Sequence, residues 1–353
     1  MKKKRISSSF IITGTAIALS LLLAFVLVFH TSPTPVEALK ELILGPFESK
    51  RKIGLIVTTS LPSIFTGLAF CIMFRAGQFN LSPDGIFYVC AAVAAAVGIG
   101  MPLPKGIHPL MGILLCAVLG GVLCLIPAFL KMKYKANIIV SSLMYNYILF
   151  YFGMFLLAEV IRDKATGNMV SAKMASTARF DVMIPKTGIH WGALAAVVAV
   201  VWTYWFLYKT KKGYEIRLTG DNPQFAKYVG INIVKTVMMA QLAGGILAGI
   251  GGAVEMYGMY DRFQWITNPG YGWEGFVVAV LAKNNPAYVP LAALFLGYLS
   301  VGSDIIVQRC AVPPDAIPAI RAIMIVLIGA QGFMGSWKHK RMLKEKMIVE
   351  GGQ

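Results

Sequence analysis

The chain has 353 residues, of which 57% are hydrophobic and 14% are charged, and its mean hydropathy is +0.68. Soluble domains carry about 25% charged residues, so this composition excludes an ordinary soluble protein. The 33 Lys and Arg outnumber the 16 Asp and Glu, which gives a formal net charge of +17. The basic residues gather in loops between apolar runs, as the positive-inside rule describes, and no soluble basic domain is left to bind nucleic acid.

Apolar runs recur along the whole chain, and each membrane crossing needs about 20 such residues. The first run follows the basic cluster Lys2–Arg5 and is longer than the apolar core of a signal peptide, so we interpret it as an uncleaved helix. We therefore expect an all-α polytopic membrane helix bundle, one transmembrane domain over 1–353, with about ten spans and both termini in the cytoplasm. The expected spans are 10–29, 53–74, 85–100, 108–130, 138–159, 190–208, 236–257, 274–283, 286–303 and 317–334.

The loops of this topology carry charge unevenly. The basic loops Lys131–Lys135 and 209–235 and the basic tail 336–353 fall on the cytoplasmic side, as the positive-inside rule requires. The cluster Lys50–Lys52 falls outside and breaks the rule. The external loop 160–189 is the longest on its side and has room for short amphipathic structure.

Two segments interrupt the continuous spans. Residues 274–283 are too short to cross alone, which indicates a broken or re-entrant piece enclosed by protein or by a cavity. The segment Phe74–Gly85 contains Gly77 and Pro83, which favour irregular backbone, and polar side chains that can hydrogen-bond it. It is either an ordinary turn or an unwound element that lines a transport path, and the sequence leaves both open.

Polar side chains also gather on one sector of the span 138–159. Ser142 and Asn146 are i,i+4 neighbours, and Ser141 and Tyr145 lie beside them. These side chains either hydrogen-bond to neighbouring helices or line a hydrophilic passage.

The chain offers little catalytic or metal-binding chemistry. It contains no Gly-Lys dipeptide, so it has no Walker A loop, and its spans hold no hydrolase motif. We therefore expect a protein that is not an enzyme and holds no metal. The cysteines have no metal-like spacing and fall mostly in apolar runs, where we expect small buried hydrophobes: Cys71, Cys90, Cys116, Cys124 and Cys310.

Ionisable residues avoid the middle of every expected span. Those nearest to a span lie at an edge: Asp84, Glu159, Glu255, Glu274, Asp304 and Arg321. Ion-coupled carriers need carboxylates or histidines inside the membrane, because a charge there is costly and persists for function. An ion-coupled carrier is therefore only the alternative from another class, and the energy for transport is expected to come from elsewhere.

Residues 208–257 join a basic polar loop to a glycine-rich apolar segment. Asn222 is suited to cap a short helix, Pro223 to its first position and Gly230 to the position after its end, which predicts a helix Pro223–Val229. A helix of this length is not stable alone, so another protein is expected to hold it. Two ridges of small residues follow and predict close helix packing: Gly244, Ala248 and Gly252 on one, and Gly245, Gly249 and Ala253 on the other.

Three segments in consistent order resemble the permease subunits of ABC importers for nucleosides and simple sugars. Arg75–Gly85 is similar to the motif RAGxFNxGxxG, Gly220–Ile231 to GxNPxAAxxxGI, and Gly272–Pro286 to GxxGIAVALLGxxxP. The resemblance covers about residues 50–335. Ser82, Pro83 and Asp84 depart from the first motif, and Phe225 replaces one alanine of the second.

The resemblance implies an ATP-driven importer of a small polar solute in a bacterial plasma membrane. It favours a nucleoside, with a simple sugar such as ribose or galactose as the alternative. The implied partners are a cytoplasmic ABC ATPase that carries the ATP and Mg, a second, non-identical permease and an extracellular substrate-binding lipoprotein, with membrane lipid around the spans and no cofactor on this chain. The residues expected along the translocation path are Arg75, Phe79, Asn80, Ser141, Ser142, Tyr145 and Asn146. Those expected to couple to the ATPase are Gly220, Asp221, Asn222, Pro223, Phe225, Ala226 and Gly230.

Overall fold

The computed structural model describes residues 34–310, so the expected spans 10–29 and 317–334 and the tail 336–353 lie outside the described residues. The described residues form two compact units, one over Lys50–Gly297 and one that joins residues 34–49 to residues 298–310. Within the described part the chain is helical, with two isolated β-bridges.

Seven helical segments in the described range are long and apolar enough to cross a membrane. They agree with the expected spans between 53 and 303, apart from the short segment 274–283. They are α3 (Lys50–Arg75), α4 (Pro83–Gly100), α5 (Ile107–Tyr134), α6 (Ile138–Phe155) with a π-helical turn η2 (Leu156–Val160), α7 (Gly192–Lys209), α10 (Ile233–Met259), and α12 (Val289–Cys310) with a 3-10 turn η4 (Pro286–Tyr288). The short segment forms α11 (Tyr271–Leu281), an apolar helix of 11 residues.

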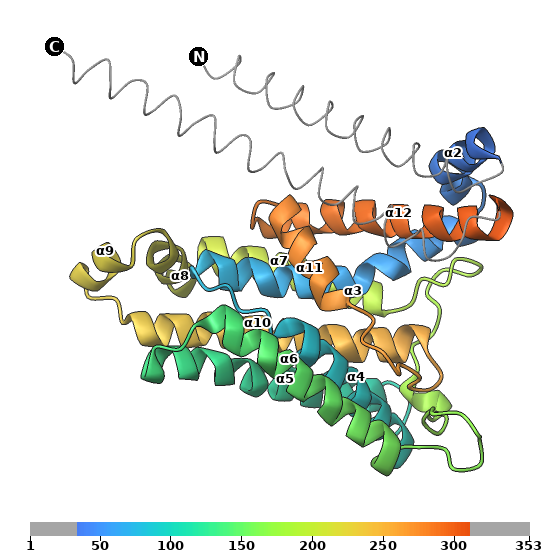
Figure 1. Ribbon diagram of the computed structural model, residues 1–353, viewed down its shortest axis with the longest axis horizontal. Helices are drawn as coiled ribbons and strands as arrows, with labels where there is room; N and C mark the ends of the chain where they lie inside the picture. The colour runs from blue at the N-terminus through green and yellow to red at the C-terminus, as the bar shows by residue number, and fades with distance from the viewer. Residues whose placement is uncertain (1–33, 311–353) are drawn as a thin grey trace. The chain divides into compact units, whose positions relative to one another are not determined.

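The larger unit has an inner and an outer set of helices. In α3, α4 and α10 the most apolar stretches of 18 residues are 83%, 78% and 72% buried. The corresponding stretches of α5, α6 and α7 are only 33%, 28% and 28% buried. Helix α10 packs against α3, α4 and α5 (Figure 1). The outer helices expose large apolar side chains such as Val118, Ile148 and Val201, a surface suited to lipid or to another membrane subunit.

The small residues of α10 explain how it can pack on three neighbours. A Cβ at Gly244 would lie 3.1 Å from the Ala69 oxygen of α3, and a Cβ at Gly252 would lie 3.0 Å from the Ala91 nitrogen of α4. Gly245 and Gly249 face the backbone of α5 around Gly120, and Ala248 is fully buried. Any larger side chain at these glycines would push neighbouring helices apart.

The basic loops of the larger unit lie at one end of its bundle. The end of α5, the helices α8 (Lys211–Asp221) and α9 (Pro223–Tyr228), and the start of α10 meet there (Figure 1). The sequence predicted a single short helix in the loop 209–235, and α8 is an additional helix. Thr210 caps α8 by accepting from the Gly213 N–H at 3.0 Å. The polar composition of this segment is typical of a loop, which is why α8 was not predicted.

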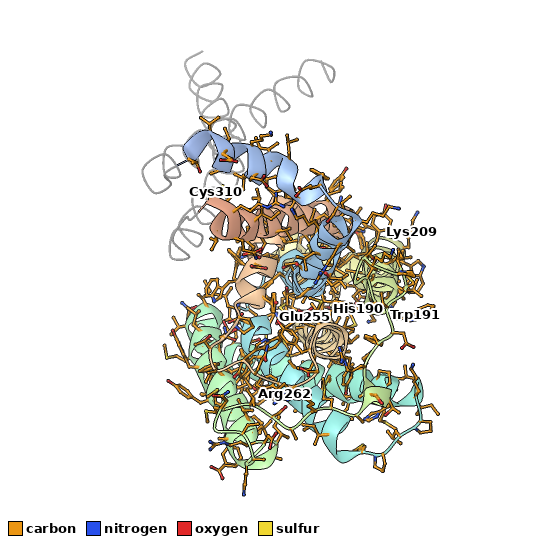
Figure 2. The ribbon with its side chains drawn as sticks, turned by 90° about the vertical axis from the view of Figure 1, so that its right-hand side faces the viewer. His190, Trp191, Lys209, Glu255, Arg262 and Cys310 are labelled. Atoms are coloured by element: carbon orange, nitrogen blue, oxygen red, sulfur yellow. The ribbon has the colours of Figure 1, made fainter. Side chains whose placement is uncertain are left out.

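The long loop 160–189 packs as irregular chain against the opposite end. It carries only one 3-10 turn, η3 (Ser176–Ala178), rather than amphipathic helix. Its backbone pairs with residues 261–263, for example through Ser171 N–H to the Phe263 oxygen at 2.9 Å. His190, labelled beside α10 in Figure 2, is 1% exposed and stacks on Phe180, and burial lowers the pKa of its imidazole to about 4. The imidazole is therefore neutral at pH 7 and accepts from the Gly192 N–H.

The second unit contains a helix that the sequence analysis did not expect, α2 (Pro35–Leu44), followed by a 3-10 turn η1 (Gly45–Phe47). Arg309 near the end of α12 pairs with Glu41 at 3.0 Å and with Glu48 at 2.9 Å. The Tyr298 hydroxyl donates to the Ile43 oxygen at 3.0 Å. The helix α2 is amphipathic and short, which is why a search for long apolar runs passed over it.

All five cysteines lie in the described range, and all five are buried and unbridged. This confirms that they are small interior side chains, as their position in apolar runs predicted.

Candidate functional site

The first interruption of the bundle lies between α3 and α4. Helix α3 ends at Arg75, Gly77 takes a positive φ of 69°, and the chain then turns back until α4 begins at Pro83. Asn80 is fully buried in this segment, donates to Gln241 of α10 at 2.7 Å and accepts from the Ser82 N–H at 3.0 Å. The segment is therefore an unwound, ordered element inside the protein, not an exposed turn.

Two polar residues of α6 hold this unwound segment. The Ser142 hydroxyl accepts from the Leu81 N–H at 3.0 Å. The Asn146 amide donates to the Leu81 oxygen at 2.8 Å and accepts from the Gly85 N–H at 3.0 Å. Unpaired backbone groups cost several kcal/mol where no water is present, so these side chains permit the interruption. Both are buried and share one sector of α6, as their i,i+4 spacing predicted.

The start of α4 lies deep in the bundle. Asn146, which holds it, comes eight residues after Ile138, the first residue of α6, or about 12 Å along the helix. The hydrocarbon core of a membrane is about 30 Å thick, so this position is close to its middle.

A second interruption meets the first at this depth. The Tyr271 oxygen, at the start of α11, accepts from the Thr66 hydroxyl at 2.9 Å, and Thr66 comes nine residues before the end of α3, or about 14 Å. Helix α11 therefore starts inside the bundle, which agrees with the broken or re-entrant piece that the sequence predicted here. The Asp84 carboxylate joins the two interruptions, because it accepts from the Gly272 N–H at 3.0 Å and from the Asn268 amide at 2.6 Å.

These contacts correct one premise of the sequence analysis. Asp84 and Glu274 were placed at the edges of spans, but Asp84 is 5% exposed between two half-helices, and Glu274 accepts from Ser63, 12 residues before the end of α3. Glu255 of α10 is 2% exposed and accepts from the Tyr271 hydroxyl at 3.3 Å (Figure 2). Asp84 and Glu274 lie near the first residues of α4 and α11. Because these two helices begin inside the bundle, their first residues are not at a membrane edge.

A pocket opens beside Asp84, and we call it the mid-bundle pocket. Its volume is 390 Å³, which is in the range of small-molecule sites. It is lined by Asp84, Leu143, Asn146, Tyr147, Phe150, Tyr151, Thr267, Asn268, Gly270 and Trp273. Four of its lining side chains are aromatic, three on α6 and Trp273 on α11, and the others include one carboxylate, two amides and the Thr267 hydroxyl.

The other residues expected along the path have different surroundings. Arg75 donates to the Asn284 oxygen at 2.9 Å and so anchors the turn after α11. Phe79 is half exposed and its ring lies 4.8 Å from that of Phe74. Ser141 bonds within its own helix, and Tyr145 is half-buried. Of the seven residues predicted for the path, only Asn146 lines the mid-bundle pocket.

The basic end carries the predicted coupling helix, α9. The Asn222 side chain accepts from the Phe225 N–H at 3.0 Å, which confirms the predicted cap. Gly230 has a φ of 82° and its N–H bonds to the Lys227 oxygen, while the Ile231 N–H bonds to the Ala226 oxygen, so the helix ends in a Schellman motif one residue earlier than predicted.

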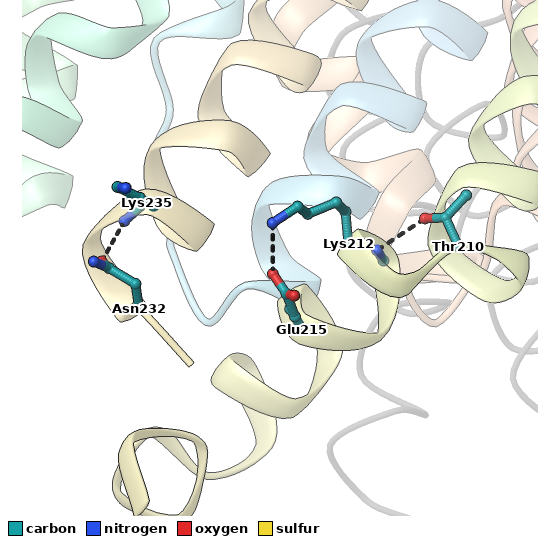
Figure 3. A network of polar contacts seen from close by, with 6 residues as sticks. Thr210, Lys212, Glu215, Asn232 and Lys235 are labelled. Carbon is teal, nitrogen blue, oxygen red and sulfur yellow. Dashed lines mark hydrogen bonds and ion pairs between the residues drawn. The ribbon is translucent and has the colours of Figure 1, made fainter. Parts of the chain in front are cut away.

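The surroundings of α9 leave its apolar side chains in the open. Phe225, Tyr228 and Val229 are 52%, 90% and 58% exposed. Figure 3 shows the caps and the ion pair nearby: Thr210 caps α8, Lys212 pairs with Glu215 at 3.1 Å, and Asn232 accepts from the Lys235 N–H to cap α10. The helix is thus held firmly at its base by α8 and α10 and presents its outer side.

The unwound segment between α3 and α4 touches the end of α8. A Cβ at Gly77 would lie 3.3 Å from the Gly220 Cα, and a Cβ at Gly220 would lie 2.9 Å from the Gly77 nitrogen and would collide with the Arg75 oxygen. Only glycines allow this approach of backbone to backbone. The end of α8 therefore touches the unwound segment directly, in addition to the packing of α10 on its neighbours.

Comparisons with known proteins agree with this arrangement. A family model described as "branched-chain amino acid transport system / permease component" matches residues 53–329. The guanosine ABC transporter permease protein NupP of Bacillus subtilis is 28% identical over 290 residues, covering 81% of this chain and 83% of that protein. A glucose ABC transporter permease protein of Haloferax volcanii is 29% identical over 316 residues (86% and 83%). The nucleoside ABC transporter permease protein NupB of Lactococcus lactis is 24% identical over 326 residues (90% and 89%).

The family match extends from α3 to beyond the described residues and includes both interruptions and α9. With its multiple membrane spans, the chain therefore belongs to this family of permease components and is the multi-pass membrane subunit of an ABC transporter.

Proposed function

We propose that this chain carries nucleosides across the membrane as one of two non-identical permeases, powered by ATP that a separate cytoplasmic ATPase hydrolyses with Mg. The chain itself holds no cofactor. Relatives named for guanosine and nucleosides support the substrate, together with the FN form of the first motif. A relative named for glucose favours a simple sugar as the second candidate.

The observation that carries this proposal is the exposed apolar side of α9. A helix of six residues is not stable alone, and exposed aromatic side chains at a polar, lysine-rich end have no lipid to cover them. A protein partner that grips Phe225, Tyr228 and Val229 is the best account of both features. The basic residues around α8 favour the cytoplasmic face for this end.

The same reasoning assigns the other surfaces. The exposed apolar sides of the outer helices α5, α6 and α7 suit lipid and the second permease. The loops 160–189 and 260–270, at the end opposite to α9, suit the extracellular lipoprotein that delivers the substrate.

The experiment replaces Phe225 and Tyr228 together by Ala in a tagged permease that is expressed with its ATPase. We expect co-purification of the ATPase to fall at least about tenfold, because aromatic side chains dominate most interfaces. The matched control is the double change Phe152→Ala and Phe155→Ala, two exposed and stacked aromatic side chains on α6. Both variants are expected to insert into the membrane, and normal ATPase recovery with the α9 variant would refute the coupling assignment.

A further inference from the structure

We propose that the mid-bundle pocket binds the nucleoside in transit, with its base against the aromatic wall and its ribose hydroxyls at the polar end. This inference rests on the proposed import of nucleosides and names the residues of this chain that touch the substrate. The argument uses the position, the wall, the polar groups and the connection of the pocket to the coupling end.

The position of the pocket is the first argument. Asn146 and Asp84, which line it, lie where α4 and α11 both begin, about 12 Å from the start of α6. Irregular backbone at such depth is tolerated where it lines a cavity, and in membrane transporters the ends of interrupted helices form substrate sites near the middle of the membrane.

The wall supplies flat apolar surface. Tyr147 and Tyr151 of α6 are 62% and 67% exposed, and Trp273 of α11 is 48% exposed, so their rings are not consumed by packing. Every nucleobase has a flat π-face that stacks on an aromatic side chain without regard to sequence. The two elements that carry these rings approach the pocket from different parts of the bundle.

The polar end supplies acceptors and donors for hydroxyl groups. The Asp84 carboxylate has about four acceptor positions, and bonds from the Asn268 amide and from the Gly272 and Trp273 backbone occupy three. Carboxylates bind ribose hydroxyls in dinucleotide sites through the same chemistry. Thr267 adds an exposed hydroxyl beside this group. A simple sugar would also use this end, but it would offer the aromatic side chains only the C–H face of its ring, whereas a nucleoside adds a planar base.

The connection to the coupling end gives the pocket a means of release. Asn146 bonds to the unwound segment at Leu81 and Gly85, and that segment meets Gly220 of α8 through Gly77. A shift of α8 and α9 would therefore reach Asp84, at the start of α4, and change its position relative to the aromatic side chains of α6. A bound nucleoside would lose part of its contacts when the ATPase changes state.

The test uses the complete complex, with ATPase, second permease and binding protein, in membranes. We would measure ATP-dependent uptake of labelled guanosine and labelled glucose, and then photolabel the complex with 8-azidoadenosine and map the labelled peptides. Wild type is expected to import guanosine and to be labelled in residues 143–151 or 267–273, with labelling suppressed by guanosine and not by glucose.

The matched variants are Trp273→Leu in the pocket and Trp205→Leu on α7, whose tryptophan is 55% exposed outside it. We expect the Trp273→Leu change to lower labelling and guanosine uptake about tenfold, because the stacking contact between the base and the indole ring is lost. The Trp205→Leu change is expected to leave both unaltered. Tyr151→Leu provides a second pocket variant if Trp273→Leu does not assemble.

The outcomes separate the two proposals. If the wild-type complex imports glucose and no guanosine, the proposed substrate is wrong and the pocket assignment falls with it. If it imports guanosine but the pocket variants match Trp205→Leu, or the label lies outside both segments, the pocket assignment alone is overturned.

Discussion

Asn146 shows how one side chain can decide the course of the backbone around it. Its amide group makes two hydrogen bonds to the chain before and after Pro83, and Ser142 one turn away makes a third. The sequence indicated these residues through their spacing and left two roles open. In the structure both residues form hydrogen bonds with the backbone of the interruption between α3 and α4. Asn146 also lines the mid-bundle pocket.

The first prediction concerns Asn146→Leu. This change leaves the Leu81 oxygen and the Gly85 N–H without their partners inside the bundle, and each loss costs about 1–3 kcal/mol. We expect uptake to fall about tenfold or more and the thermal midpoint of the purified complex to drop, while assembly survives. The control is Ser141→Ala, whose hydroxyl bonds only to its own helix, at the Ile138 oxygen. Unchanged uptake by Asn146→Leu would contradict this role.

Arg75 is a second residue whose surroundings differ from the expectation. It was placed along the translocation path, and its guanidinium instead bonds to the Asn284 oxygen and to the Tyr208 hydroxyl at 3.3 Å. It therefore ties the end of α3 to the turn after α11 and to α7. Its role along the path remains a prediction.

Helices α8 and α9 form the element that links the coupling surface to the interior. Helix α9 is fixed by its own caps, and α8 lies with Gly220 against the unwound segment. The cap is made by the Asn222 side chain, and the approach of Gly220 to Gly77 is made by backbone alone, so α8 and the unwound segment are in direct contact. Packed backbone contacts of this kind deform little, because protein interiors are close-packed.

The prediction at this scale is that Gly220→Ala separates ATP hydrolysis from transport. The added Cβ would meet the Arg75 oxygen and must displace α8. Because the outer side of α9 is untouched, we expect the ATPase to co-purify normally while substrate uptake falls about tenfold for each 1.4 kcal/mol of coupling lost. Gly100→Ala is the control, since a Cβ at Gly100 meets open space. Loss of the ATPase together with uptake would place Gly220 in the docking surface instead.

At the scale of the whole molecule, the buried carboxylates raise the question of what drives transport. Asp84 accepts from Gly272 and Asn268, the buried Glu255 accepts from the Tyr271 hydroxyl, and the half-buried Glu274 accepts from Ser63. These contacts tie the carboxylates to neighbouring helices, and the family of the chain points to ATP.

The prediction for the whole molecule is that uptake follows ATP and not the proton gradient. In cells that carry the complete complex, nucleoside uptake is expected to stop when ATP is depleted and to continue with an uncoupler while ATP is held constant. A collapse of uptake under the uncoupler alone would favour ion coupling through the buried carboxylates.

The sequence determined the helical membrane fold, the positions of the long spans and the caps of α9, because each depends on the local pattern of apolar and capping residues. It also indicated that residues 274–283 are a broken piece, since their length alone excludes a full crossing. It did not reveal α2 or α8, because short polar helices take their stability from neighbours that are distant in the chain.

Only the tertiary structure decided where the interruptions lie. Asp84 and Gly272 are far apart in the sequence and meet in the middle of the bundle, and Gly77 meets Gly220 at its end. No local sequence pattern encodes these contacts. They depend on how far each chain segment returns into the protein before its helix begins. The mid-bundle pocket is built from two such segments and from the continuous helix α6, so its existence is a property of the packed bundle and not of any one motif.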